Sequence, residues 1–204
     1  LIALRVRLHL DLPGCAGPCQ HRKADGTICG APLDAKGIHA RACPFGGWLV
    51  RRHDAACAVL ADWCRELGCQ VDTEVVLPMA NAAHLGSRMD LVVRSAAFAG
   101  PAYIDLTIVS VVSAEALAKG AAHAGGVACA IAARRKRASY PQVPVTPFVI
   151  EDHGRLGDEA LGFARKIVPA GLHARSRALL RLYQRLGVTC QRPAADAVTA
   201  AVRL

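Results

Sequence analysis

The fold is decided by the stretch RMDLVVRSAAFAGPAYIDLTIVSVV, residues 88–112, in which two apolar runs each contain an aspartate. The runs at 88–95 and 102–112 are rich in Val, Ile and Leu, and small residues, glycine and proline separate them, which is typical of two strands joined by a loop. Asp90 lies inside the first run and Asp105 inside the second. A carboxylate within an apolar strand is costly unless it is paired or bound to a metal, so these two acids are candidates for a functional site.

The residues on either side of this stretch complete an α/β pattern. Apolar side chains recur at three- and four-residue steps from Arg51 to Gly68, which predicts a helix, and two further β-rich runs occupy 71–78 and 145–152. A long Ala-rich helix between the third and fourth strands favours a crossover and a mixed sheet with helices on both faces. The helices expected after the third strand are 114–139, interrupted at Gly125-Gly126, then 158–168 and 172–186.

The two ends of the chain carry weaker signals. Apolar residues alternate with other residues from Ile2 to Leu10, and this period of two predicts a strand or linker at 1–12 that belongs to a preceding region. The chain begins with Leu1 rather than Met, so we expect it to be a piece of a longer protein. The expected organisation is a Cys/His module at 13–50, a core at 51–187 and a C-terminal tail at 188–204, whose last dozen residues have a poorly specified pattern.

The charge of the chain suits a polyanionic partner. The formal net charge is +9 and the pI is near 9.4. Such an excess favours nucleic acid, because each neutralised phosphate releases counterions, although a basic face can also be simply solvated. No apolar run reaches the roughly 18 residues that a membrane span needs. The residues that we expect to contact DNA are Arg51, Arg52 and His53 at the start of the first helix, and Arg134, Arg135 and Arg137 in the Ala-rich helix.

Cysteines crowd the N-terminal fifth of the chain, which otherwise has no sustained apolar pattern. Cys29 and Cys43, one further cysteine and His39 would provide three thiolates and one imidazole, a set typical of closed structural zinc sites. The spacing of His39 and Cys43 suits such a site. The expected set is Cys19, Cys29, His39 and Cys43, but Cys15 could substitute for Cys19, and His21 is a further spare ligand. The alternative for the whole group is free thiols in a flexible segment.

The acids and a later lysine form the candidate catalytic group. If their strands are neighbours, Asp90 and Asp105 could point off one face and share a magnesium ion. Glu74 is a third acid of this kind, and the alternative for each acid is an exposed strand edge. Lys136 and Tyr140 are four residues apart, so they share a helix face, from which they could stabilise charge on a phosphate and position a water molecule. Their pattern alone does not rank Lys136 above its arginine neighbours.

An ordered set of motifs carries a resemblance to a known family. The set is CGAPLDAKGIHARACPFGGWLVRRHDAA at 29–56, TEVVLP at 73–78, RMDLVV at 88–93, YIDLTIVS at 103–110 and RRKRASY at 134–140. From Cys19 to Asp152 the chain resembles the restriction-like endonuclease region at the C-terminal end of site-specific non-LTR retrotransposon polyproteins. In that family a Cys/His zinc knuckle precedes a nuclease core of the PD-(D/E)XK type.

The resemblance assigns roles to individual residues. Asp90 corresponds to the acid of the PD element and Asp105 to the second acid. Lys136 and Tyr140 correspond to the lysine and tyrosine on the following helix. Thr107 stands two residues after Asp105, where many nucleases of this type have lysine, so Lys136 is expected to supply the positive charge instead.

The resemblance also implies an activity and its partners. It implies a magnesium-dependent endonuclease that nicks double-stranded DNA and hands the new 3′ hydroxyl to a reverse transcriptase for target-primed copying. It further implies a structural zinc ion, a nuclear location, no membrane, and element RNA and a reverse transcriptase domain in the same parent polyprotein. Two alternatives belong to other classes: a catalytically inactive zinc-containing nucleic-acid-binding domain, and an unrelated α/β interaction domain.

Overall fold

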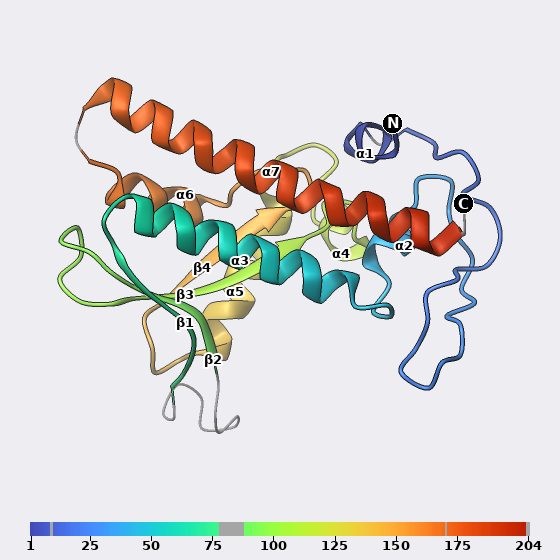
Figure 1. Ribbon diagram of the computed structural model, residues 1–204, viewed down its shortest axis with the longest axis horizontal. Helices are drawn as coiled ribbons and strands as arrows, with labels where there is room; N and C mark the ends of the chain where they lie inside the picture. The colour runs from blue at the N-terminus through green and yellow to red at the C-terminus, as the bar shows by residue number, and fades with distance from the viewer. Residues whose placement is uncertain (9, 78–87, 170, 203–204) are drawn as a thin grey trace. The chain divides into compact units, whose positions relative to one another are not determined.

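The computed structural model describes residues 1–8, 10–77, 88–169 and 171–202, and it divides into two compact units. Unit 1 comprises Leu1–Ala56 and Gly187–Leu204, and unit 2 comprises Cys57–Leu186. Figure 1 traces the elements in chain order.

The centre of unit 2 is a four-stranded mixed sheet in the order β1-β2-β3-β4. Neighbouring strands are antiparallel from β1 to β3, and β4 lies parallel to β3. The expected α/β class and mixed sheet are therefore confirmed, while residue 78, the expected end of the first strand, lies outside the described residues. The strands are β1 (Gln70–Val76), β2 (Arg88–Arg94), β3 (Ala102–Val109) and β4 (Val145–Glu151).

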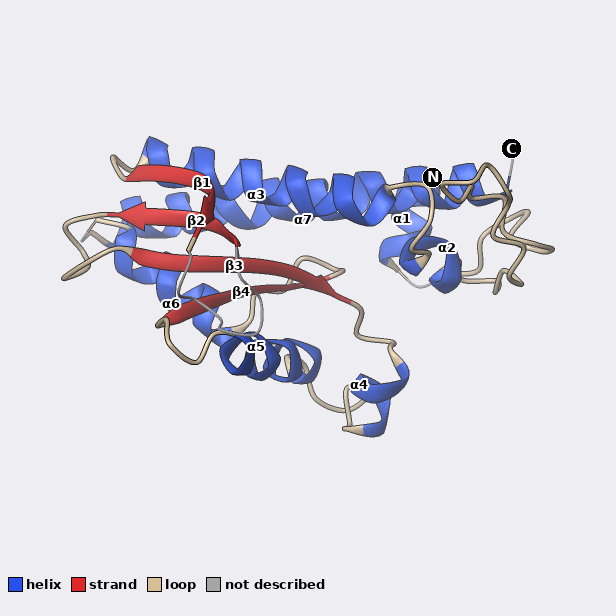
Figure 2. Cartoon of the chain, turned by 90° about the horizontal axis from the view of Figure 1, so that it is seen from below, coloured by secondary structure: helices blue, strands red, loops and turns tan. Residues whose placement is uncertain are grey.

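Helices cover both faces of this sheet. In Figure 2, α5 lies on one side of the sheet, and the parts of α3 and α7 in unit 2 lie on the other. The latter two helices are in contact, because the indole nitrogen of Trp63 donates a hydrogen bond of 3.0 Å to the carbonyl of Ala178. In the described part of the chain no helix is both long and apolar enough to cross a bilayer. The helices of unit 2 are α3 (Trp48–Glu66), α4 (Ala114–Ala118), α5 (Val127–Ser139), α6 (Asp158–Ile167) and α7 (Leu172–Val202), of which α3 and α7 continue into unit 1.

The two faces of the sheet differ in polarity at its centre. Ile104 and Leu106 of β3 are completely buried on one face, where Phe148 of β4 pairs with Leu106 and packs edge-on against Phe163 of α6 at 6.1 Å. Side chains alternate along a strand, so Asp105 points to the other face, toward α5. The apolar face thus anchors the sheet, and the opposite face is left for polar chemistry.

The crossover between β3 and β4 consists of two helices rather than the single interrupted helix that we expected at 114–139. The first, α4, ends at Ala118, and α5 begins only at Val127, so the break is longer than the glycine pair that we expected to cause it. Gly120 and Gly126 adopt φ angles of 89° and 87° in this break. Glycine reaches these angles at little steric cost, which allows the chain to turn between the helices.

The prediction of a strand at the N-terminus was wrong, because residues Ile2–Arg7 form a helix, α1. Val6 is 3% exposed in the core of unit 1, and Ile2 packs against the same core. Positions four apart share one face of a helix. An alternation of two also places an apolar residue at every fourth position, so the sequence pattern fits both structures and burial decides between them.

The C-terminal tail that we expected at 188–204 is largely helical. The helix α7 continues to Val202, although Gly187 and Pro193 lie in its interior. Glycine and proline cost roughly 1 and 3 kcal/mol inside a helix. Burial of one helix face at steps of three and four residues offsets that cost. The buried residues of this part of α7 are Cys190, Gln191, Ala194, Ala195, Ala197, Val198 and Ala201.

This C-terminal part of α7 completes the core of unit 1. Val198 and Ala201 pack with cysteines of the N-terminal segment in one apolar cluster. The backbone N–H of Gln20 donates to the carbonyl of Ala201 at 3.0 Å, and the Nε2 atom of His21 lies 2.8 Å from the carbonyl oxygen of Ala197. The Cys/His module is therefore built from both ends of the chain.

Gly37 is a tightly packed point of unit 1. Its φ is +63°, and a Cβ atom there would lie 2.7 Å from Leu12 Cδ1 and 3.0 Å from Val198 Cγ2. We expect Gly37→Ala to lower the free energy of unfolding by about 2–5 kcal/mol, through left-handed strain and overpacking together. Urea denaturation measures this loss.

Gly26→Ala is the matched control. Its φ is +83°, but nothing lies within 4 Å of the added Cβ. Only the strain of about 1–2 kcal/mol is expected there. Equal losses in the two variants would contradict the packing explanation.

Candidate functional site

The first candidate site is a cluster of Cys19, Cys29, His39 and Cys43 in unit 1. Their ligand atoms all lie within 4.8 Å of one another. The Sγ atoms of Cys19 and Cys43 are 4.0 Å apart, and Cys29 Sγ lies 3.5 Å from His39 Nε2. Zinc–sulfur bonds of about 2.3 Å at tetrahedral angles would place two sulfurs about 3.8 Å apart. The four side chains could therefore hold a zinc ion.

The backbone explains the wide spacing between Cys19 and Cys29. The N–H of Cys19 donates to the carbonyl of Ala31 at 2.8 Å, and the N–H of Gly30 donates to the carbonyl of Cys19 at 3.0 Å. The two cysteines consequently lie on facing segments of the chain. A nine-residue separation in sequence thus becomes a direct contact between ligands.

The structure also separates the ligands from the two spare residues nearby. Cys15 is buried in unit 1, but its Sγ is not among the clustered ligand atoms of the described residues. The ring of His21 is directed to the carbonyl of Ala197. The alternative between Cys15 and Cys19 is thereby resolved in favour of Cys19 as the fourth member.

A short helix, α2 (Ile38–Ala42), positions the other two ligands. The carboxylate of Asp34 accepts backbone N–H bonds from Lys36, Ile38 and His39 at 3.0, 2.9 and 2.8 Å. Burial raises the pKa of Asp34, but these N–H bonds outweigh it, and the pKa is lowered overall. An ionised Asp34 therefore fixes the start of α2, which presents His39 and is followed directly by Cys43. The N-cap position is Gly37, which has no side chain, so Asp34, three residues earlier, accepts the N–H groups at the start of the helix instead.

The thiols of the cluster differ in acidity. Burial, together with the neighbouring thiols, raises the pKa of Cys43 to about 12, and burial also raises the pKa of Cys19. A backbone hydrogen bond from Ala31 lowers the pKa of Cys29. Zinc binds thiolates, so loading the cluster must release protons.

The second candidate site lies in unit 2, where β2 and β3 separate. Leu91 pairs with Ile104, and the next pair in this register would be Asp90 with Asp105, but within the described residues the pairing ends at Leu91. Instead, the carboxylate of Asp90 accepts the backbone N–H of Leu106 at 2.6 Å. The Asp90 side chain thus replaces a bond of the strand ladder and brings the two acids to the same place.

Asp105 is the buried centre of this site, at 4% exposed. Lys136 Nζ lies 2.6 Å from its Oδ1, whereas Oδ2 has no partner at hydrogen-bond geometry in the described part of the chain, although the nearby Tyr140 hydroxyl lowers the pKa of the carboxyl. Burial raises the pKa of Asp105 and the charge of Asp90 adds to this effect, while Lys136 and Tyr140 oppose it. Burial and the two acids raise the pKa of Tyr140 to about 12. The four residues expected from the sequence are therefore electrostatically coupled.

The helix α5 brings the lysine and the tyrosine to the acids. Lys136 lies in its last turn, and Tyr140 follows its last residue. The ring of Tyr140 packs on an apolar cluster formed by Met89, Val92 and Val145. This packing holds the tyrosine hydroxyl beside the polar centre of the sheet.

Glu74 lies beside the site but is engaged elsewhere. The register of β1 and β2 places it level with Asp90. Its φ of 54° is unusual for a residue other than glycine and marks local strain. Its carboxylate forms an exposed ion pair with Arg88 at 3.1 Å. A catalytic role for Glu74 therefore stays a prediction.

The three expected DNA contacts at the start of α3 differ in exposure. Arg51 is exposed and stacks over the ring of Trp48 at 4.9 Å. His53 Nδ1 lies 3.3 Å from the carboxylate of Asp54. Arg52 is only 9% exposed, which disfavours a DNA contact by this residue.

The basic cluster on α5 is partly neutralised. Arg135 forms an ion pair with Glu115, and Arg137 forms one with Glu159. Arg134 is exposed and lines a pocket beside α5. Sequence patterns missed Arg155, which lines the same pocket, because a single arginine in a turn has no periodic signal.

The sequence of the chain matches no protein-family model and no curated protein. The candidate sites are therefore assigned from their geometry and chemistry.

Removal of one member of the Cys/His cluster should abolish zinc binding. We expect the wild-type chain to retain about one zinc ion after dialysis and Cys43→Ser to retain almost none, because a closed site needs four ligands. Metal analysis of the purified proteins measures this. Cys15→Ser removes a buried thiol outside the cluster and should keep the zinc. Loss of zinc in both variants, or in neither, would rule out the assigned set.

The raised pKa of Asp105 predicts a pH-dependent cost to folding. As the pH rises past the ordinary value of 3.8, the unfolded chain loses this proton before the folded chain does. Without added metal, the wild type should lose stability relative to Asp105→Asn from that pH up to the folded pKa, and the difference should stay constant above it. Urea unfolding of both proteins from about pH 3 to pH 7 measures this. A difference that grows in favour of the wild type would show that the acid stabilises the fold.

Proposed function

We propose that unit 2 is a metal-dependent DNA endonuclease with a restriction-endonuclease-like core. The observation that carries the proposal is the buried Oδ2 atom of Asp105, which has no hydrogen-bond partner among the described residues. It lies in a site with a second acid, Asp90, and with Lys136 at 2.6 Å from the other oxygen. A purely structural acid would be expected to have both oxygens satisfied, so the open oxygen favours a ligand.

The topology agrees with this proposal. Three antiparallel strands, a crossover through α5 and a parallel strand β4 follow one another in the order that the family resemblance implies. The acids come from the two central strands, and the lysine comes from the crossover helix. Rigid elements thus present all three groups, which suits catalysis better than a loop does.

The chemistry of the donor set fits a hard divalent cation such as magnesium, which prefers carboxylate oxygens. Asp105, through Oδ2, and Asp90 would hold it. When bound, the ion would polarise the scissile phosphate and lower the pKa of a bound water molecule.

The chain's own groups have distinct tasks in this proposal. The Leu106 N–H holds Asp90 in a single orientation. Lys136 brings a positive charge to the place where negative charge develops on the phosphate. Tyr140, with its pKa raised to about 12, keeps its proton at neutral pH and can donate a hydrogen bond to the phosphate or to water.

The proposed substrate is double-stranded DNA, in agreement with the net charge of +9. The new 3′ hydroxyl would prime reverse transcription by a domain of the same parent polyprotein, with the element RNA as template and in the nucleus. Unit 1, with zinc, would be a structural module of this enzyme.

Nicking of a supercoiled plasmid in the presence of magnesium tests the activity. We expect Asp90→Ala and Asp105→Ala to abolish nicking, and Lys136→Ala to slow it by roughly 10²–10³-fold, the size typical of a lost charge-stabilising group. The control is Asp72→Ala, which removes an exposed acid that is paired with Arg94. Circular dichroism checks that each variant is folded.

Unchanged nicking in either aspartate variant would overturn the assignment. A wild-type chain that binds DNA but shows no magnesium-dependent cleavage would instead identify an inactive nucleic-acid-binding domain. Such binding would weaken steeply with salt.

A further inference from the structure

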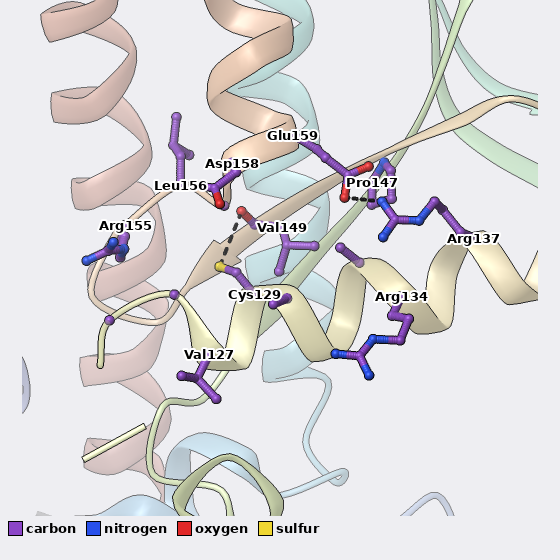
Figure 3. A pocket seen from close by; sticks show the side chains of 15 residues that line it. Val127, Cys129, Arg134, Arg137, Pro147, Val149, Arg155, Leu156, Asp158 and Glu159 are labelled. Atoms are coloured by element: carbon purple, nitrogen blue, oxygen red, sulfur yellow. Dashed lines mark hydrogen bonds and ion pairs between the residues drawn. The ribbon is translucent and has the colours of Figure 1, made fainter. Parts of the chain in front are cut away.

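A pocket of about 430 Å³ lies where α5, β4 and the start of α6 meet (Figure 3). Apolar side chains such as Cys129 and Val149 line it, together with the arginines Arg134, Arg137 and Arg155. None of the lining residues belongs to the acid site described above. The pocket is therefore separate from the acid site.

Two of its three arginines are available to a ligand. Arg137 is bound by Glu159. Arg134 and Arg155 are exposed, and their guanidinium groups form no hydrogen bond or ion pair within the described part of the chain. An unpaired guanidinium can bind a phosphate through two parallel N–H bonds, so each of these side chains is a candidate phosphate ligand.

The position of Arg155 depends on a glycine pair. A Cβ atom on Gly125 would lie 2.3 Å from Arg155 Nη1, and a Cβ on Gly126 would lie 3.7 Å from its Nε. The guanidinium thus lies directly over the backbone at the start of α5. The absence of side chains at these two positions is what makes this contact possible.

The positive charge of the pocket comes from the arginines and not from a helix end. The buried carboxylate of Glu151 already accepts the N–H of Gly126 at 3.0 Å, so it neutralises the start of α5. Asp158 and Glu159 also line the pocket, against three arginines, so the lining has one excess positive charge. An anion would gain the most binding free energy at the unpaired guanidinium groups of Arg134 and Arg155.

The spacing of the two open arginines points to a ligand with several phosphates. They lie at opposite ends of the pocket (Figure 3). Gly126, beside Arg155, is eight residues from Arg134, which corresponds to about 12 Å along α5. A single phosphate does not span this distance, but the successive phosphates of one nucleic-acid strand do.

We propose that this pocket binds the phosphate backbone of one nucleic-acid strand, with Arg155 and Arg134 on phosphates a few nucleotides apart. The inference rests on the proposed function, because it assigns a track for the DNA outside the cleavage site. The apolar side chains that line the pocket, such as Cys129 and Val149, lie between the two arginines.

Fluorescence anisotropy with a labelled short DNA duplex tests the proposal, in EDTA so that no cleavage occurs. Arg155→Ala and Arg134→Ala should each weaken binding roughly two- to fivefold, the effect of an exposed charge pair. Each should also reduce the slope of log affinity against log salt by about 1, the loss of one phosphate contact.

Two further variants serve as controls. Arg155→Lys keeps the charge and should retain most of the salt slope. Arg65→Ala removes an exposed arginine outside the pocket that is already paired with Asp62, and it should leave affinity and slope unchanged. A similar loss in Arg65→Ala would mean that only total charge matters, which overturns the pocket.

The outcomes separate this inference from the proposed function. If both pocket variants keep the slope of log affinity against log salt while the wild type nicks DNA with magnesium, the pocket does not bind the strand, but the proposed nuclease activity is retained. Reduced slopes in the pocket variants, with nicking unaffected by Asp105→Ala, would support the track and overturn the catalytic site. Pyrophosphate could also bind in an Arg155-dependent way with the same affinity as the duplex. That result would overturn the strand and assign the pocket to a small phosphate ligand.

Discussion

The burial of the Asp105 carboxylate is the constraint on which the arrangement of unit 2 depends. Removing a charge from water costs several kcal/mol unless partners replace the lost hydration. Lys136 meets part of this requirement from α5, and the Tyr140 hydroxyl supports it. The pairing of the strands also changes here, because the Asp90 carboxylate accepts the N–H of Leu106 where the ladder between β2 and β3 would otherwise continue. One oxygen of Asp105 is still left without a partner at hydrogen-bond geometry in the described chain, which is the property expected of a site built for a ligand.

The crossover helix links this site to the neighbouring pocket. One side of α5 presents Lys136 to the acids, and another side lines the pocket with Arg134 and Arg137. Its start is set by Gly126, which is held by the buried Glu151 and covered by Arg155. A shift of this helix would therefore disturb both places, so their geometries depend on the same packing of α5 against β3 and β4.

The stability of unit 1 has a different basis, because its N-terminal segment has few apolar residues. Small modules rarely bury enough surface to fold alone and commonly use a metal or a covalent link. Here the four clustered ligands and the end of α7 act together, because the same cysteines that could hold zinc pack against Val198 and Ala201. The loops at its centre depend on this shared core, and Gly37 leaves the space in which α2 and α7 approach each other.

Local patterns in the sequence determined the strands, the mixed sheet, the two acids Asp90 and Asp105 and most of the Cys/His ligands, because alternation, helical spacing and ligand chemistry act over a few residues. The same patterns misassigned 1–12, where an alternation also fits a helix, and specified 188–204 poorly, where Gly187 and Pro193 suggest an end that burial overrides. Tertiary structure alone decided that Cys19 rather than Cys15 joins Cys29 and that Arg52 is buried, and it brings Lys136, which only the family resemblance had singled out among the basic residues, to Asp105. These choices depend on contacts between residues distant in the chain, and such contacts leave no periodic trace in the sequence.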